Sequence, residues 1–204
     1  MIRTKICGIT QPEQVTPICA LGVDAIGLVF YDPSPRSVSI EQAIAIRKAV
    51  PAYVSVVGLF VDQTVERINR IAAQVQLDSI QFHGAHSVQQ CQGADRPWYR
   101  ALRVAAGQSV AELVEPWVEQ GQGVLLDTYV KGVPGGTGAA FNWDQVPKSR
   151  TWNLILAGGL TPDNVATAVQ QTTPWAVDVS GGVEASPGVK DIDKVRAFMQ
   201  GVHS

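Results

Sequence analysis

The chain of 204 residues carries little charge. Asp, Glu, Lys and Arg make up only 17% of its residues, and the formal net charge is −2. Because there is no basic excess, the charge balance does not favour binding to nucleic acid or to an anionic membrane surface. A phosphate group bound by this chain would therefore be held by local geometry and not by a broad positive field.

Long apolar runs and paired cysteines are also missing. No run reaches the length of a membrane-spanning helix, and the N-terminal M-I-R-T-K-I-C-G lacks the apolar core of a signal peptide. Cys7, Cys19 and Cys91 are odd in number and share no C-x-x-C spacing. Free thiols in a reducing compartment are therefore favoured over a disulfide framework or a zinc site, and we expect a cytoplasmic protein.

What the chain does have is an alternation of short β-rich runs with longer amphipathic ones, in a composition that is 46% hydrophobic. The β-rich runs are continuously apolar, as expected for strands covered on both faces. The predicted strands are Thr4–Gly8, Ala25–Phe30, Ser55–Phe60, Ser79–Phe82, Trp98–Val104, Gly123–Leu126, Leu154–Ala157 and Ala176–Val179. The predicted helices are Pro12–Leu21, Ile40–Val50, Val65–Gln74, Val88–Gly93, Val110–Gln120, Pro162–Gln170 and Ile192–Gln200, with a weak turn near Trp143–Val146.

No linker or low-complexity stretch divides this pattern. It predicts an α/β fold in which residues 1–204 form one domain, a (β/α)8 barrel. A doubly wound open sheet is the alternative. No G-x-G-x-x-G follows the first strand, which weakens the nucleotide-binding version of that alternative.

The segment from Val124 to Trp143, V-L-L-D-T-Y-V-K-G-V-P-G-G-T-G-A-A-F-N-W, is the most informative part of the chain. It delivers Asp127 to the end of a buried strand, where a carboxylate is costly unless it has a partner, so Asp127 is a candidate acid or base. The glycines that follow let backbone amides approach an anion closely. Together they suggest a site that binds a phosphate and moves a proton.

In a barrel, the active site lies at the carboxyl ends of the strands. Loops after the seventh and eighth strands commonly bind phosphate there, and this chain has A-G-G-L-T-P and D-V-S-G-G-V-E at those two places. The residues that this rule brings together are Cys7, Arg36, His83, Asp127, Gly158-Gly159 and Ser180-Gly181-Gly182.

Several of these residues have two interpretations. Cys7 is either a small buried hydrophobe or, at the last strand position before Gly8, a thiolate facing the pocket that could take a proton from carbon. Arg36 follows two prolines and is either a solvated side chain or a fork for a substrate carboxylate. For His83 a hydrogen-bonded strand-end histidine is favoured over a proton carrier, and for Asp178 a structural role is favoured over a catalytic one.

No metal site is indicated. His83, His86 and Cys91 form a poor set of ligands, because nothing supplies a convincing further ligand or the usual spacing.

Six motifs, in the expected order from Lys5 to about Asp191, resemble those of phosphoribosylanthranilate isomerase. They are K-I-C-G-I-T at the start, S-P-R-S-V in the second loop, Q-F-H-G at the fourth strand, L-L-D-T with G-G-T-G-A-A-F-N-W, L-A-G-G-L-T-P-D-N-V, and D-V-S-G-G-V-E. Each fragment alone is weak, but the combination is specific.

The resemblance implies a (β/α)8 or TIM barrel and the isomerase step of tryptophan biosynthesis, an Amadori rearrangement without a metal or organic cofactor. It implies that Asp127 is the general acid, that Cys7 is the general base and that Arg36 binds the carboxylate of a phosphorylated small-molecule substrate. The phosphate would rest on amides of Gly136, Thr137, Gly138, Gly158, Gly159, Ser180, Gly181 and Gly182. A monomer and a homodimer both remain open.

Two positions depart from the family pattern. Gly181 stands where the family more often has serine or arginine, and Ala85-His86 stand where an acidic residue is usual. Two other functions remain to be weighed. One is a different sugar-phosphate isomerase, epimerase or indole-forming synthase, against which the Cys7 and Asp127 pair argues. The other is a barrel that binds a phosphorylated ligand without turnover.

Overall fold

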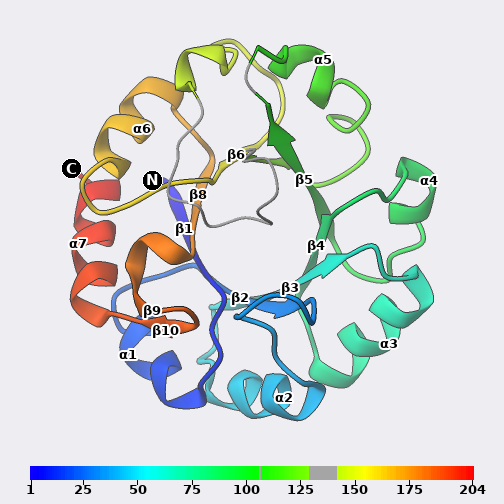
Figure 1. Ribbon diagram of the computed structural model, residues 1–204, viewed down its shortest axis with the longest axis vertical. Helices are drawn as coiled ribbons and strands as arrows, with labels where there is room; N and C mark the ends of the chain where they lie inside the picture. The colour runs from blue at the N-terminus through cyan, green and yellow to red at the C-terminus, as the bar shows by residue number, and fades with distance from the viewer. Residues whose placement is uncertain (106, 129–141) are drawn as a thin grey trace.

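A computed structural model describes residues 1–105, 107–128 and 142–204. Eight parallel strands close into a barrel in chain order, with helices around the outside (Figure 1). The strands are β1 (Arg3–Cys7), β2 (Ala25–Phe30), β3 (Ser55–Val61), β4 (Ser79–His83), β5 (Trp98–Val104), β6 (Val124–Thr128), β7 (Leu154–Leu156) and β8 (Ala176–Val179). The predicted (β/α)8 barrel is confirmed.

The helical segments follow the strands, and the α-helices cover the outside of the barrel (Figure 1). They are η1 (Pro12–Gln14), α1 (Val15–Cys19), α2 (Ile40–Ala49), α3 (Val65–Val75), α4 (Val88–Cys91), α5 (Val110–Val114), η2 (Trp143–Gln145), α6 (Val165–Thr172), η3 (Gly181–Val183) and α7 (Ile192–Val202). Within the described ranges, no helix has both the length and the apolar character needed to cross a membrane.

Two faces of each strand serve two different cores, because successive side chains of a strand point to opposite sides. Ile6, Leu126 and Val177 point outward and join the large cluster that packs against the helices. The neighbouring positions point into the barrel, where a smaller cluster contains Val57, Tyr99, Ala101, Leu125, Ile155, Ala157 and Ala176. Towards the carboxyl ends, the inward positions are therefore the ones that can reach a ligand.

Local signals account for several helix starts. Ser39 accepts a hydrogen bond from the amide of Gln42, and the Gln42 side chain accepts one from the amide of Ser39, a complete capping box at the start of α2. In the same way, Asp191 caps α7 by accepting from the amides of Asp193 and Lys194.

Several predicted helix ends were wrong, most clearly those of α5 and α6. Helix α5 ends at Val114 and not at Gln120, because Pro116 has no N–H to continue the helical hydrogen bonds. Helix α6 begins at Val165 and not at Pro162, because Asn164 accepts from the amide of Thr161 and stabilises a turn before the helix.

The sequence pattern missed a small hairpin after β8. Strands β9 (Glu184–Ser186) and β10 (Val189–Lys190) pair antiparallel around Gly188, whose φ of 82° suits a residue without a side chain. The Thr10 hydroxyl donates to the carbonyl of Gly188 at 2.6 Å, and the Gln14 amide donates to the carbonyl of Lys190 at 3.1 Å. The hairpin is thereby fastened to the segment that follows β1.

Candidate active site

A cavity of about 860 Å³ lies at the carboxyl ends of the barrel strands. Its lining contains eight of the predicted site residues: Cys7, Arg36, Asp127, Gly158, Gly159, Ser180, Gly181 and Gly182. The other three, Gly136, Thr137 and Gly138, lie outside the described residues. A second cavity, of about 460 Å³, lies around Tyr53 and Asp78 and contains none of the predicted residues.

Cys7 is the last residue of β1, and its side chain is buried against β2. It is 5% exposed and lies beside Gly27, where an added Cβ would approach its Sγ to 2.7 Å. Burial raises the pKa of the Cys7 thiol, and the positive charge of Lys5 opposes that rise. Burial therefore favours the thiol, and a thiolate here depends on nearby positive charge.

Asp127 lies across the mouth of the barrel, near the end of β6. It follows the inward-facing Leu125 by two residues, so its side chain also points inward, and it is 9% exposed. In the parallel pairing of β5 with β6, its direct neighbour is Arg103, which lines the same cavity. The structure thus places a buried carboxyl group and a buried thiol on different strands of one cavity.

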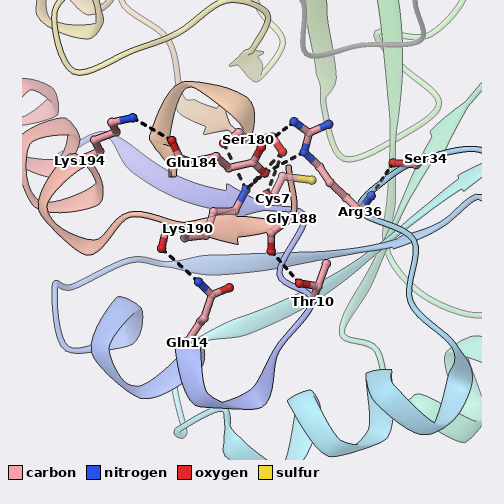
Figure 2. Close-up of polar contacts among 10 residues, drawn as sticks. All are labelled: Cys7, Thr10, Gln14, Ser34, Arg36, Ser180, Glu184, Gly188, Lys190 and Lys194. Atoms are coloured by element: carbon pink, nitrogen blue, oxygen red, sulfur yellow. Dashed lines mark hydrogen bonds and ion pairs between the residues drawn. The ribbon is translucent and has the colours of Figure 1, made fainter. Parts of the chain in front are cut away.

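Arg36 is held by a carboxylate of the protein itself. Its Nε donates to Glu184 Oε1 at 2.8 Å and its Nη2 donates to Glu184 Oε2 at 2.7 Å, a bidentate pair (Figure 2). Hydrogen bonding to Glu184 raises the pKa of Arg36. The Nη1 group is the part of the fork that Glu184 does not engage.

Glu184 has a second cationic partner, Lys190, whose Nζ donates to Oε1 at 2.7 Å (Figure 2). Burial alone would raise the pKa of Glu184, but the hydrogen bonds from Arg36 and Lys190 outweigh it and lower that pKa. Lys190 also donates to the Ser180 carbonyl at 3.1 Å, and the Ser180 hydroxyl donates to the Cys7 carbonyl at 3.0 Å. One network therefore joins the Arg36 loop, the β9–β10 hairpin and the end of β1.

The glycine loops after β7 and β8 lie against each other. Gly158 and Gly159 have φ values of 79° and 70°, in the left-handed region that suits glycine. A Cβ added at Gly182 would lie 1.9 Å from the carbonyl oxygen of Leu160, so only glycine allows this approach of the two loops. The predicted neighbourhood of the two glycine pairs is confirmed.

His83 fits the favoured interpretation of a hydrogen-bonded histidine. Its Nε2 lies 2.8 Å from the side-chain nitrogen of Gln81, which can only donate, so Nε2 accepts and carries no proton. Burial, together with the positive charges of Arg103 and Lys5, lowers the pKa of His83 to about 3. Within the described chain, no group of three or more His, Cys, Asp and Glu side chains is arranged to hold a metal ion.

Sequence reasoning missed the partners of the predicted residues. Lys5 is ion-paired with Asp178 at 2.8 Å inside the barrel, and Glu184 engages Arg36. A signal for the first pair existed, because Lys5 and Cys7 occupy alternate positions of β1, as do Gln81 and His83 in β4. Polar residues at every second position identify the inward face that approaches the site.

These features define a class, the (β/α)8-barrel enzymes, with acid–base groups and glycine loops at the carboxyl ends of the strands. Comparison with known proteins goes further. Residues 4–201 match the family "N-(5'phosphoribosyl)anthranilate (PRA) isomerase". The N-(5'-phosphoribosyl)anthranilate isomerase of Stutzerimonas stutzeri is 52% identical over 204 residues, which is 100% of this chain and 98% of that protein.

Solved structures agree. The phosphoribosyl anthranilate isomerase of Thermotoga maritima superposes with a TM-score of 0.92 at 36% identity, covering 100% of this chain and 99% of that one. Another structure of a phosphoribosyl anthranilate isomerase, in complex with reduced 1-(o-carboxyphenylamino)-1-deoxyribulose 5-phosphate, gives a TM-score of 0.85 at 34% identity, with coverage of 100% and 99%. The chain belongs to the phosphoribosylanthranilate isomerase family and is an aldose–ketose isomerase of tryptophan biosynthesis.

Proposed function

We propose that Asp127 is the general acid and Cys7 the general base with which this chain converts N-(5'-phosphoribosyl)anthranilate to 1-(2-carboxyphenylamino)-1-deoxyribulose 5-phosphate. The observation that carries the assignment is the placement of these two buried groups in one cavity, on β6 and β1, beside Arg36 and two glycine loops. Both are residue types that transfer protons in enzymes, and each lies where a bound sugar could contact it.

The reaction begins with ring opening. The Asp127 carboxyl group gives its proton to the ribose ring oxygen as the bond from C1 to that oxygen breaks, and the nitrogen lone pair forms a C1=N⁺ iminium. The Cys7 thiolate then takes the proton from C2, and the electrons of that C–H bond form the C1=C2 bond of a neutral enolamine. Loss of the enol proton from oxygen and gain of a proton at C1 give the ketone. None of these steps calls for a metal or an organic cofactor.

The iminium also explains how a buried thiol can act. Its positive charge lies next to the C2 proton, which makes that proton more acidic and favours the thiolate over the thiol. The reaction thus requires a protonated Asp127 and a deprotonated Cys7. Their positions on different strands keep the two groups apart.

The two anionic ends of the substrate would be bound by different parts of the cavity. We assign the phosphate to backbone amides of Gly158-Gly159 and Ser180-Gly181-Gly182, together with Gly136-Thr137-Gly138. We assign the anthranilate carboxylate to Arg36, through the Nη1 group that Glu184 leaves available. The three free thiols fit the reducing, cytoplasmic location expected from the sequence.

The test is a fluorescence assay of phosphoribosylanthranilate consumption, with the substrate generated in situ. Wild type is compared with Cys7→Ser and Asp127→Asn, and binding of the reduced product analogue is measured for each. We expect turnover by the wild type and losses of roughly 10²–10⁴-fold or more in both variants, with the analogue still bound. A folded wild type that binds the analogue without turnover would overturn the proposal.

A further inference from the structure

A buried ion pair lies inside the barrel next to Cys7. Lys5 precedes Cys7 by two residues on β1, so both side chains point inward. The Lys5 ammonium donates to Asp178 Oδ2 at 2.8 Å and to Gln81 Oε1 at 3.0 Å. Lys5 and Asp178 are also direct neighbours in the pairing of β1 with β8, and each side chain is 7% exposed.

Packing does not account for this pair. Two charges buried in a barrel cost free energy that their attraction repays only in good geometry, and apolar side chains of similar volume are often as stable or more so. Moreover, Asp178 Oδ1 is buried without a hydrogen-bond partner among the described residues, which adds a further cost. A structural role alone would be better filled by apolar residues, such as the Leu125 and Ile155 of the same interior.

The end of the Lys5 side chain and the Cys7 sulfur both pack over Gly27. A Cβ added at Gly27 would lie 2.7 Å from Cys7 Sγ and 2.9 Å from Lys5 Cε. The two atoms therefore both lie over Gly27, and the absence of a side chain at this position of β2 is what admits both. The ammonium is held at its far end by Asp178 and Gln81, so its position next to the sulfur is fixed.

We infer that Lys5 is a positioning residue for the reaction: its ammonium, held by Asp178 and Gln81, keeps the sulfur of Cys7 available as a thiolate. The inference rests on the proposed role of Cys7 as general base. Its central observable, the ionisation of Cys7, can nevertheless be measured without substrate.

Other charged and titratable groups also act on Cys7, and they set the direction expected for each variant. Burial raises the pKa of Cys7 most, Lys5 lowers it most, Asp178 raises it and Lys190 lowers it. Arg36 and Tyr99, from the β2 loop and from β5, also interact with Cys7 electrostatically. Because Lys5 outweighs Asp178, removal of both charges should still make the thiolate harder to form.

The test measures the rate of Cys7 alkylation by iodoacetamide against pH, with each modified cysteine located by peptide mass spectrometry. The variants are Lys5→Gln, which leaves the Asp178 carboxylate, and the double variant Lys5→Met/Asp178→Asn, which leaves no lone buried charge. We expect the midpoint of the Cys7 profile to rise in the order wild type, double variant, Lys5→Gln. A rise of one pH unit lowers the thiolate fraction, and with it kcat, by about tenfold, while KM changes little.

Two controls distinguish the loss of the Lys5 charge from a general loosening of the protein structure. Cys19, in α1, should keep its own profile in every variant. Arg100→Met removes a cation that is 6% exposed but packs on Trp117, outside the cavity lining, and it should leave the Cys7 profile unchanged. If one Lys5 variant does not fold, the other still tests the inference.

An unchanged Cys7 profile in a folded Lys5 variant would overturn the inference, as would an equal rise in Arg100→Met. A shifted profile with unchanged kcat has a different meaning. It would leave the coupling of Lys5 to the thiol in place but overturn the role of Cys7 as base, and with it the proposed function.

Discussion

The layer between the strands and the helices differs in kind from the space inside the barrel. Outside, fully buried side chains such as Ile26, Phe82 and Phe198 form one continuous apolar core. Inside, apolar side chains such as Leu125 share the space with a polar network that contains Lys5, Gln81, Tyr99, His83 and Asp178. The outer layer supplies apolar burial, whereas the inner one gives up part of that burial to hold charges in place for chemistry.

The largest effect is expected from a substitution inside the barrel that leaves the outer core unchanged. Asp127→Asn removes the proton donor from a side chain of nearly the same shape, so kcat should fall by roughly 10²–10⁴-fold. The melting temperature should stay close to that of the wild type, because no apolar core is lost. Steady-state kinetics and calorimetry on the same sample check both parts. An active Asp127→Asn variant would remove Asp127 from the mechanism.

The second prediction concerns a substitution that disrupts only the packing of the outer core. Phe198, on α7, is fully buried, and Phe198→Ala should lower the free energy of unfolding by about 3–5 kcal/mol through lost apolar burial and a cavity. Urea denaturation measures this, and kcat measured well below the unfolding transition should remain near that of the wild type. A large loss of kcat in the folded variant would contradict this prediction, because it would show that packing of the outer core controls the active site.

The third prediction concerns the clamp on Arg36. Glu184→Gln replaces a charged bidentate partner by a neutral one, so Arg36 is held less firmly and KM should rise about tenfold, the effect of a charged hydrogen bond of roughly 1.5 kcal/mol. A substrate analogue that lacks the carboxylate should not distinguish Glu184→Gln from wild type. If KM rises equally for the substrate and for this analogue, Glu184 acts on the site as a whole and not through Arg36.

The last prediction is a pH dependence of stability that belongs to the inner region and is smaller than the effect of Phe198→Ala. His83 has a pKa near 3 in the folded chain, against an ordinary value of 6.5, so the unfolded chain binds the extra proton first. Stability should therefore fall as the pH drops below about 6.5, by at most roughly 1.4 kcal/mol per pH unit from this group. Urea midpoints from pH 7.5 to 5 should show a weaker slope in His83→Gln. An identical slope would mean that His83 titrates normally.

Prediction from the sequence succeeded for local features and failed for contacts between distant residues. The pattern located β2, β5 and β8 at the ends observed, because apolar runs bounded by turns are local signals. Most of the predicted site residues lie in one cavity because barrel geometry brings strand ends together.

The polar partners could not be foreseen in the same way. Lys5 and Asp178 are 173 positions apart and Arg36 and Glu184 are 148 apart, so each pair exists only once the barrel has closed. The β9–β10 hairpin was missed because strands of three and two residues are too short to show a period. The alternation of Lys5 with Cys7 and of Gln81 with His83 was visible in the sequence, and it marks the inward face of β1 and β4.

The most direct test of the central claim follows the C2 proton itself. Phosphoribosylanthranilate carrying deuterium at C2 is generated in situ, and kcat is compared for light and heavy substrate with wild type and with Cys7→Ser. The account predicts that Cys7→Ser turns over far more slowly and with a larger isotope effect than wild type, because proton removal from C2 becomes the slow step. A Cys7→Ser variant that keeps the wild-type kcat, or one that slows without any isotope effect, would contradict the assignment of Cys7 as the base.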